Sequence, residues 1–180
     1  VAVSYTDGGS IMETVYSDAL GPNKTPQAEL VYGDVTKTYG DAVFFHIATG
    51  GSGTGAVTYS SDTPSVASID ADSGEVTIHK AGSTTLTVNK AGDAAYAAAS
   101  ASCTLTVGKA VLTATVGDSS KTYGDANPAF PVAVTGFVYG ETAATAAGYT
   151  APTASCAADT ATGAGTAQIT IGGGTAHNYT

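Results

Sequence analysis

The chain has 180 residues, a formal net charge of -9 at pH 7 and a pI near 4.3, and all of its basic residues are lysines. A negatively charged chain repels polyanions, and it lacks arginine, the side chain that forks onto phosphates and guanine edges, so we expect no nucleic-acid partner. No run approaches the roughly 18 consecutive apolar residues that would cross a bilayer, so we do not expect membrane insertion by this segment. The length suits one large domain or two of about 90 residues each.

An alternation of apolar and polar side chains with a period of two dominates the N-terminal part of the chain and predicts β-strands. Short runs of this kind at 66–69 and 76–78 are followed by the longer patterns "TTLTV" and "CTLTV". The threonines of these patterns suit a solvent-facing side, because threonine is both β-branched and polar. The opposite, inward positions are Leu86, Val88, Cys103, Leu105 and Val107.

The alanine-rich run 94–101 is too short for a stable helix and continues into a strand pattern, so we expect a loop or a single turn there. From "TLTV" to "LTATV" the chain passes between two strand patterns with almost no linker, which predicts a boundary near Gly108 to Lys109. A joint this short predicts a semi-rigid rod. The second pattern continues through 168–171, and its first inward positions are Leu112, Ala114 and Val116.

Strands that recur about every ten residues, with Gly, Asp, Ser and Pro clusters between them, are typical of antiparallel β-sandwiches. We therefore expect an all-β protein made of two tandem immunoglobulin-like β-sandwich modules. The first thirty residues lack the layout of a secretory signal, which leaves an intracellular protein or an excised piece of a longer one. The Ala-, Thr- and Gly-rich, weakly charged composition favours an excised extracellular piece.

Two stretches carry a resemblance to known families. Residues 51–107, with "YSSDTPSVASID" and "GEVTIHKAGSTTLTV", resemble the bacterial immunoglobulin-like repeats of group-2 type found in surface proteins and adhesins. Residues 112–180, from "LTATVGDSSKTYGDANPAF" through "GFVYGE" to "GGGTAHNYT", resemble the MBG repeats of large bacterial exported proteins. The resemblance implies a β-rich fold and a cell-surface setting.

These patterns predict three parts of the chain. Residues 1–27 are expected to be a leading segment or the tail of a preceding module, 28–108 an immunoglobulin-like β-sandwich, and 109–180 an MBG-like module. MBG repeats continue beyond "NYT" into a closing strand, so the last module is expected to lack that strand. Either the fragment was cut there or the strand comes from elsewhere, which would leave a sheet edge open to another chain.

The stretch "GDVTKTYGDA" at 33–42 recurs as "GDSSKTYGDA" at 117–126. A glycine after each tyrosine permits a turn that is closed to other residues, and alternate residues of an extended segment share one face. We expect a corner at the entry of each module, with the tyrosine ring packed on the sandwich, its hydroxyl bonded to backbone and the lysine stem across it. The alternative is a repeated ligand-contacting patch, whose residues would be Tyr39, Asp41, Tyr123 and Asp125.

Other candidates for chemistry are weaker. "DADSGE" at 70–75 places Asp70 and Asp72 before a glycine, as in a calcium loop, but it lacks a downstream bidentate glutamate, so we expect a hairpin turn. The three histidines have no metal-ligand spacing, and the two cysteines, in different modules, are expected to be free thiols. With no nucleophile elbow or phosphate-binding loop, we expect neither catalysis nor a cofactor.

The expected function is that of a non-catalytic structural spacer in an exported bacterial cell-surface protein, part of a multi-domain adhesin at the cell surface or cell wall. Its expected partners are neighbouring modules of the same polypeptide. The alternative is a carbohydrate- or host-protein-binding module that uses end loops and exposed tyrosines, for which the partner would be a host glycan or extracellular protein.

Overall fold

The computed structural model describes residues 6–7, 10–11 and 24–180, and all regular elements in these residues are β-strands. The predicted all-β class is therefore confirmed, whereas the predicted leading segment 1–27 lies mostly outside the described residues. The strands are β1 Thr6–Asp7, β2 Ser10–Ile11, β3 Leu30–Val31, β4 Val35–Thr38, β5 Phe44–Phe45, β6 Thr49–Gly50, β7 Val57–Ser61, β8 Ala67–Ile69, β9 Glu75–Ile78, β10 Gly82–Lys90, β11 Ala99–Gly108, β12 Thr113–Val116, β13 Val132–Thr135, β14 Thr153–Cys156 and β15 Ile169–Gly172.

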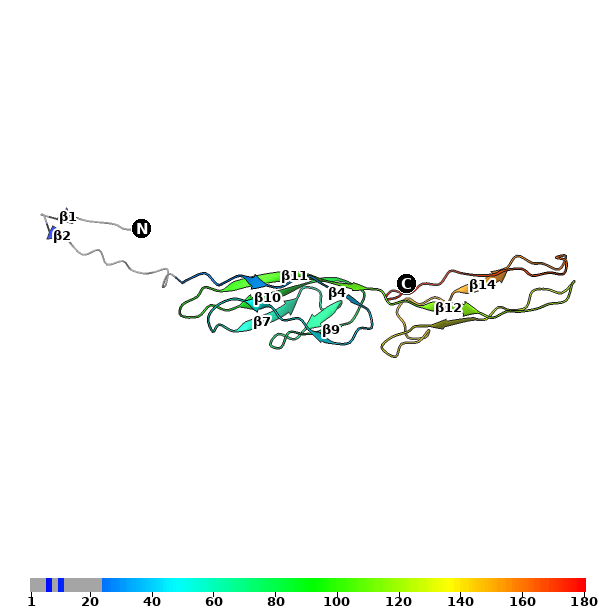
Figure 1. The fold of residues 1–180 in the computed structure, drawn as a ribbon, viewed down its shortest axis with the longest axis horizontal. Helices are drawn as coiled ribbons and strands as arrows, with labels where there is room; N and C mark the ends of the chain where they lie inside the picture. The colour runs from blue at the N-terminus through cyan, green and yellow to red at the C-terminus, as the bar shows by residue number, and fades with distance from the viewer. Residues whose placement is uncertain (1–5, 8–9, 12–23) are drawn as a thin grey trace.

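Residues 24–108, here called the N-terminal half, form two facing sheets (Figure 1). One sheet has the strand order β4-β11-β10-β7 and the other has the order β5-β9-β8, with a short β3-β6 pair beside them. Most neighbouring strands are antiparallel, as expected, but β4 runs parallel to β11, with Val35 opposite Leu105. The long strand β11 therefore lies between β4 and β10, hydrogen-bonded to both.

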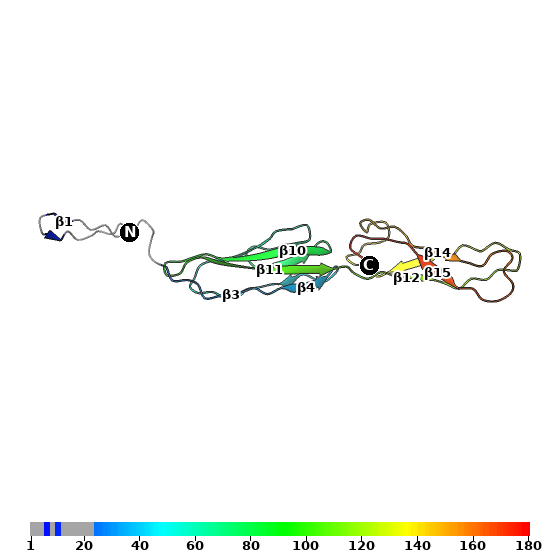
Figure 2. The ribbon, with the colours of Figure 1, turned by 90° about the horizontal axis from the view of Figure 1, so that it is seen from above.

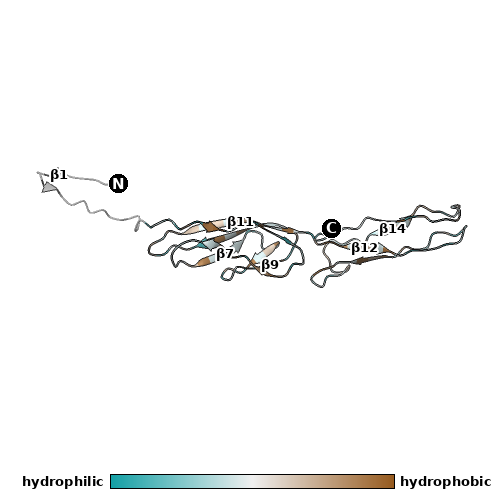
Figure 3. Ribbon diagram, in the orientation of Figure 1, coloured by the Kyte–Doolittle hydropathy of each residue, from teal (hydrophilic) through white to brown (hydrophobic). Residues whose placement is uncertain are grey.

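The period-two pattern places the core where the sequence predicts it. The inward side chains at 84–88 of β10 and 103–107 of β11 are buried, and most outward residues along the two strands are exposed, because successive residues of a strand point to opposite faces. In Figure 3 the apolar residues concentrate on the strands. The alanine-rich run forms a loop over 94–98 and joins β11 from Ala99 onward, which confirms that it makes no helix. The fully buried large side chains are Leu86, Leu105, Val76 and Val88.

Residues 109–180, the C-terminal half, are built from two two-stranded ribbons, β12-β13 and β14-β15. The inward residues Leu112, Ala114 and Val116 alternate with exposed neighbours as predicted, but they are only half-buried. Between Leu112 and Ala176 the only buried residue is Ala146. The two ribbons therefore enclose a much thinner core than the sheets of the N-terminal half.

The two halves lie end to end along the long axis of the molecule in both ribbon views (Figures 1 and 2). No strand of the N-terminal half pairs with a strand of the C-terminal half within the described residues. Their buried residues nevertheless form one continuous cluster, which passes through Tyr39, Ala110 and Tyr179 where the halves meet. Thr180 lies at this same junction, because its amide donates to the carbonyl of Ala110 (2.8 Å).

Candidate functional site

The duplicated sequence builds the same turn twice. In the first Tyr-Gly turn, Thr38–Asp41, the Asp41 amide donates to the Thr38 carbonyl (3.0 Å), and in the second, Thr122–Asp125, the Asp125 amide donates to the Thr122 carbonyl (3.1 Å). The glycines have φ values of +103° and +92°, which side-chain-bearing residues rarely adopt. A positive φ at the third position is the requirement of a type II turn.

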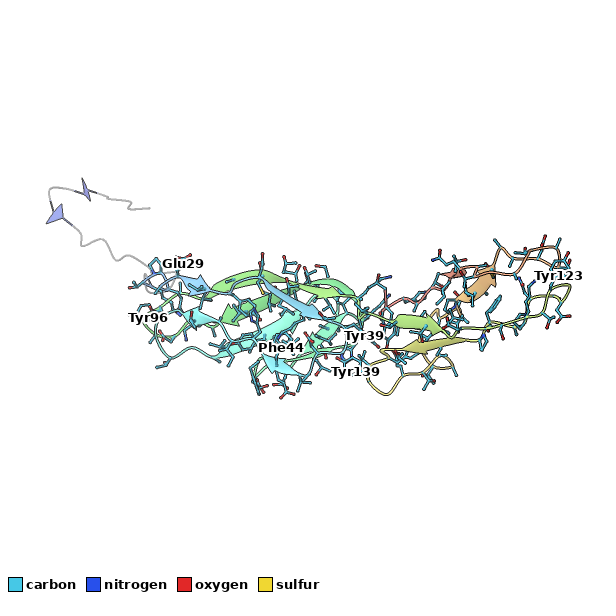
Figure 4. The ribbon with its side chains drawn as sticks, turned by 45° about the vertical axis from the view of Figure 1, so that its right-hand side comes forward. Glu29, Tyr39, Phe44, Tyr96, Tyr123 and Tyr139 are labelled. Carbon is cyan, nitrogen blue, oxygen red and sulfur yellow. The ribbon has the colours of Figure 1, made fainter. Side chains whose placement is uncertain are left out.

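The surroundings of the two turns differ completely (Figure 4). Tyr39 lies where the two halves meet and is 6% exposed, whereas Tyr123 lies at the far end of the C-terminal half and is 71% exposed. A Cβ atom built on Gly40 would lie 2.8 Å from three side-chain atoms of Val138, but one built on Gly124 would meet nothing within 4 Å. The first turn is therefore covered by the C-terminal half of the chain, and the second turn is exposed to solvent.

The surface that covers the first turn comes from another Tyr-Gly pair, at Tyr139. The Glu141 amide donates to the Val138 carbonyl (3.0 Å), and both central residues of this turn, Tyr139 and Gly140, have positive φ (53° and 70°). Two central residues with positive φ define a type I′ turn. The left-handed conformation costs a residue other than glycine about 1–2 kcal/mol, so contacts of the Tyr139 side chain must hold it in place.

Aromatic rings fill the junction. The Tyr39 ring packs edge-on against Tyr139 (centroids 5.2 Å apart, interplanar angle 84°) and against Tyr179 (5.6 Å, 89°). Behind them Phe137 contacts Tyr149 and Tyr179 at 5.6 and 5.5 Å. Edge-to-face pairs contribute about 0.5–1.5 kcal/mol each beyond the area they bury, so the contacts of Tyr39 favour one fixed arrangement of the halves.

Two hydrogen bonds cross between the halves. The Tyr139 hydroxyl donates to the Asp41 carbonyl (2.8 Å), and the Ala81 amide donates to the Asn178 side-chain oxygen (3.1 Å). Within the C-terminal half, the Tyr179 hydroxyl donates to the Glu141 carboxylate and accepts from the Val138 amide at 3.1 Å. We call the five residues that surround the first Tyr-Gly turn the junction cluster: Val138, Tyr139, Glu141, Asn178 and Tyr179.

The junction keeps its tyrosines protonated. Burial and the neighbouring Glu141 carboxylate raise the pKa of Tyr179 from 10.0 to about 12. Burial is also the main cause that raises the pKa of Tyr39 and of Tyr139. These hydroxyls therefore remain neutral hydrogen-bonding groups throughout the physiological range.

Three details of the predicted corner are wrong. The ring of Tyr123 does not pack on a sandwich, because it is 71% exposed. Tyr39 does not mark the entry of the N-terminal half, because its amide donates to the carbonyl of Gly108 (2.8 Å), at the end of β11 where the chain leaves that half. The lysine stem does not lie across the tyrosine either: the Lys37 ammonium lies 4.5 Å from the centroid of the Phe44 ring. Strand β4 ends at Thr38, so the alternation that would place Lys37 and Tyr39 on one face stops at the turn. Their side chains therefore contact different neighbours.

The candidate binding residues do not come together in one place. Tyr39 and Asp41 lie at the junction, while Tyr123 and Asp125 lie at the opposite end of the C-terminal half (Figure 4). Sequence reasoning missed Tyr139, Glu141 and Tyr179 as their partners. One available signal is the Tyr-Gly pair itself, which occurs at Tyr32 and Tyr139 as well as in the two duplicated stretches.

Asp70 and Asp72 lie in the turn between β8 and β9, as the hairpin prediction requires. One Asp70 carboxylate oxygen accepts from the Asp72 amide (3.2 Å), the Ser73 amide (2.8 Å) and the Ser73 hydroxyl (2.7 Å). The bonds from Ser73 and then Asp72 lower the pKa of Asp70. This carboxylate therefore already has a structural role in closing the turn.

The cysteines are free, and Cys103 is not set up for nucleophilic chemistry. Cys103 is buried, and its sulfur lies 3.3 Å from Nε2 of His46, but burial raises the pKa of the thiol, so it is protonated rather than a thiolate. Cys156 lies in the other half. Among the described residues no group of three or more His, Cys, Asp and Glu could hold a metal ion, and no helix could span a membrane.

Comparison with known families agrees with this all-β, two-part architecture. Residues 43–92 match the model of the intimin, immunoglobulin-like domain, and residues 112–180 match the model of the MBG domain (YGX type). The predicted arrangement, an immunoglobulin-like repeat followed by an MBG-type repeat, is confirmed. Neither the curated proteins nor the solved structures give a significant match.

Both matched families consist of non-catalytic modules that are typical of bacterial surface proteins. The match to the MBG domain (YGX type) includes the Tyr-Gly pairs at Tyr123 and Tyr139. The junction cluster lies within residues 112–180, whereas the Tyr39 turn that it covers lies just outside the other match.

Proposed function

We propose that this chain is a non-catalytic spacer in an exported bacterial cell-surface protein, where it holds more distal domains away from the cell as part of a multi-domain adhesin. Two modules aligned end to end give reach, and a packed joint gives stiffness. Under this proposal the segments 28–108 and 109–180 act as the two modules, and neighbouring modules of the same polypeptide are its partners.

The observation that carries the proposal is the burial of the first Tyr-Gly turn by the junction cluster. Tyr39 is enclosed by two edge-on tyrosines, and hydrogen bonds join Tyr139 to Asp41 and Ala81 to Asn178 across the joint. A joint without such contacts would leave the relative orientation of the halves free, since inter-domain mobility is the default where interfaces are small.

The test compares Tyr39→Ala with Tyr123→Ala, two identical changes in identical turns. Spin labels or fluorophores placed on exposed residues of each half, such as Ser65 and Thr160, report the distance distribution between the halves. We expect a single narrow distribution for the wild type and for Tyr123→Ala, and a broad one for Tyr39→Ala, because only Tyr39 fills the joint.

A broad distribution in the wild-type chain would contradict the spacer proposal, and so would an unchanged distribution in Tyr39→Ala. Small-angle scattering of the unlabelled proteins provides a second measurement, in which the maximum dimension of Tyr39→Ala should shrink as the rod bends. Thermal unfolding of each variant checks that both halves remain folded.

The second candidate function is ligand binding by the exposed end, because Tyr123 offers an exposed aromatic ring that a sugar or host protein could stack against. Burial of Tyr39 removes the first turn from this role, so Tyr123 and Asp125 alone remain as contacts. A glycan array and a pull-down against host extracellular proteins test it: saturable binding that Tyr123→Ala abolishes would favour this function over a pure spacer.

A further inference from the structure

Four of the large apolar side chains that this chain exposes lie together on the outer face of the sheet β5-β9-β8. Val43, Phe45 and Ile47 alternate along β5 and its continuation with half-buried residues that point inward. Val31 pairs with Thr49, which has the same phase, so it extends this apolar stripe. The four side chains are between 56% and 61% exposed. Contiguous exposed apolar patches of this kind mark sites of interaction.

The same residues form an unpaired edge of the sheet. β5 is its outermost strand and pairs with β9. This pairing continues in the bond from the His46 amide to the Gly74 carbonyl (2.9 Å). Because the bonds of an antiparallel pair use alternate residues, the amides and carbonyls of Val43, Phe45 and Ile47 point away from β9, where no described strand pairs with them.

The first strand of the N-terminal half leaves this edge uncovered because it changes sheets. β3 pairs with β6 next to the edge, and the chain then passes through Gly33 into β4, which belongs to the other sheet and pairs with β11. Residues 43–47, which we call the open edge, therefore have a strand only on the β9 side among the described residues. They contain no lysine, carboxylate or proline, the residues with which proteins usually protect an exposed edge.

We propose that the open edge pairs antiparallel with the open edge of a second copy of this chain, about a two-fold axis at Phe45. This register places Phe45 opposite the partner's Phe45 and Val43 opposite the partner's Ile47, so apolar side chains are neighbours on one face of a continuous sheet. These are the residues whose amides and carbonyls point outward, so each pair can exchange two hydrogen bonds. A two-fold interface has to be self-complementary, and this stripe meets that requirement.

The charges beside the open edge are also complementary to those of a second copy. The Lys37 ammonium lies 4.5 Å from the centroid of the Phe44 ring. The Gly33 carbonyl oxygen lies 3.0 Å from Nε2 of His46, which places the next residue, Asp34, beside His46. The two-fold axis exchanges positions 44 and 46, so each Lys37 comes beside the partner's Asp34.

The net negative charge of the chain does not prevent this pairing. Glu75 is the carboxylate opposite Phe45 on β9, and the two copies of β9 would lie three strand spacings apart, about 14 Å. That distance exceeds the Debye length of about 8 Å at physiological salt, so their repulsion is largely screened. Asp34 is fixed by the Thr104 amide, which donates to one of its carboxylate oxygens (2.7 Å) and leaves the other for Lys37.

This association is separate from the spacer proposal. The open edge contains no residue of the junction cluster, and its pairing lays two molecules side by side in opposite directions, which a spacer does not require. A chain that stays monomeric would leave the distance distribution between the halves unchanged. The two proposals can therefore fail independently of each other.

Sedimentation velocity of the full chain measures the association. We expect a weak monomer-dimer equilibrium at concentrations up to about 1 mM, because a few residues from each copy bury less than the roughly 1,200 Å² of a standard interface. Phe45→Lys should raise the dissociation constant at least tenfold, because it places two lysines opposite each other. Val111→Lys makes the same charge change at a side chain that is 67% exposed outside the stripe, and should change the constant by less than about twofold.

A charge swap at the axis tests the register. Phe45→Lys and Phe45→Glu should each be monomeric alone, because like charges meet at the two-fold axis. An equimolar mixture should form a heterodimer, because the lysine of one copy then lies opposite the glutamate of the other. Damage to the fold of either variant could not be repaired by mixing, so recovery of the dimer separates a direct contact from a structural effect.

Amide exchange followed by NMR as the wild-type chain is concentrated tests the edge itself. Protection should rise at Val43, Phe45 and Ile47 but not at His46, whose amide already donates to Gly74. A wild-type chain that is monomeric at about 1 mM would overturn the proposal, and so would growth into larger aggregates without a dimer. A mixture of the two charged variants that stays monomeric, or a dimer without protection at these three amides, would overturn it as well.

Discussion

The two halves of this molecule contain the same turn in the same sequence, but one half is closed around its last strand and the other is open. In the N-terminal half β11 lies between β4 and β10, and the side chains it points inward are almost fully buried. In the C-terminal half two ribbons face each other across a cleft, and their inward residues remain half-exposed. The difference shows that the same local turn can follow a strand that pairs with β11 or, in the other half, follow residues that belong to no strand.

The largest expected effect comes from making the same substitution, Leu to Ala, in the core of the N-terminal half and in the thinner core of the C-terminal half. Leu105→Ala removes a 0% exposed side chain and should lower the free energy of unfolding by about 2–5 kcal/mol. Leu112→Ala, at a half-buried inward position of the other half, should have a clearly smaller effect because less apolar area leaves water. Chemical denaturation of both variants measures the difference, and equal losses would contradict it.

The glycines of the two turns provide the next test. Gly40→Ala and Gly124→Ala both place a Cβ atom on a residue with positive φ, which should destabilise each protein by about 1–2 kcal/mol. Only the Cβ at position 40 collides with Val138, so Gly40→Ala should lose about 1–3 kcal/mol more through overpacking. Denaturation curves give the two losses.

The same pair of glycine variants also reports on the joint. Scattering should show a changed shape for Gly40→Ala alone, because the collision lies between the halves. If the two glycine variants were equally destabilised and equally shaped, the junction contact would not exist in solution.

An alkaline titration examines the junction tyrosines. The pKa of Tyr179 is raised from 10.0 in an exposed tyrosine to about 12, so ionisation favours the unfolded chain. Its contribution to stability is fully present below pH 10 and is lost as the pH rises from 10 to about 12. Tyr179→Phe should be less stable at neutral pH but show a shallower decline over this window.

The remaining decline in Tyr179→Phe should come from the other tyrosines whose pKa is raised by burial, namely Tyr32, Tyr39 and Tyr139. Unfolding free energies of the two proteins measured between pH 9 and 12 isolate the contribution of Tyr179. Identical slopes for the wild type and Tyr179→Phe would show that the Tyr179 hydroxyl is not enclosed.

The smallest expected effect occurs at acidic pH and is confined to the loop that contains Asp93. Hydrogen bonds from the Thr54, Tyr96 and Ala95 amides lower the pKa of Asp93 from 3.8 to about 2. The stability they give to this loop is present above pH 3.8 and is lost as the pH falls toward 2. Asp93→Asn should remove that pH dependence in the amide exchange of these three residues.

Much of the fold could be predicted from the sequence, because strands with a period of two show their inward face directly. Leu86, Val88, Cys103, Leu105 and Val107 are all buried as expected, and the turn at Asp70 closes the predicted hairpin. Less of the candidate site could be predicted from the sequence. The contact between Asp41 and Tyr139 joins residues 98 positions apart, and no local pattern relates them.

The sequence by itself determined the strands, their inward residues and the geometry of both Tyr-Gly turns, because alternation and a glycine with positive φ act over a few neighbouring residues. Only the tertiary structure decided that Tyr39 is buried and Tyr123 is exposed. Burial depends on which distant surface arrives to cover a side chain: Val138, Tyr139 and Tyr179 cover the first turn, and no described residue of this chain covers the ring of the second.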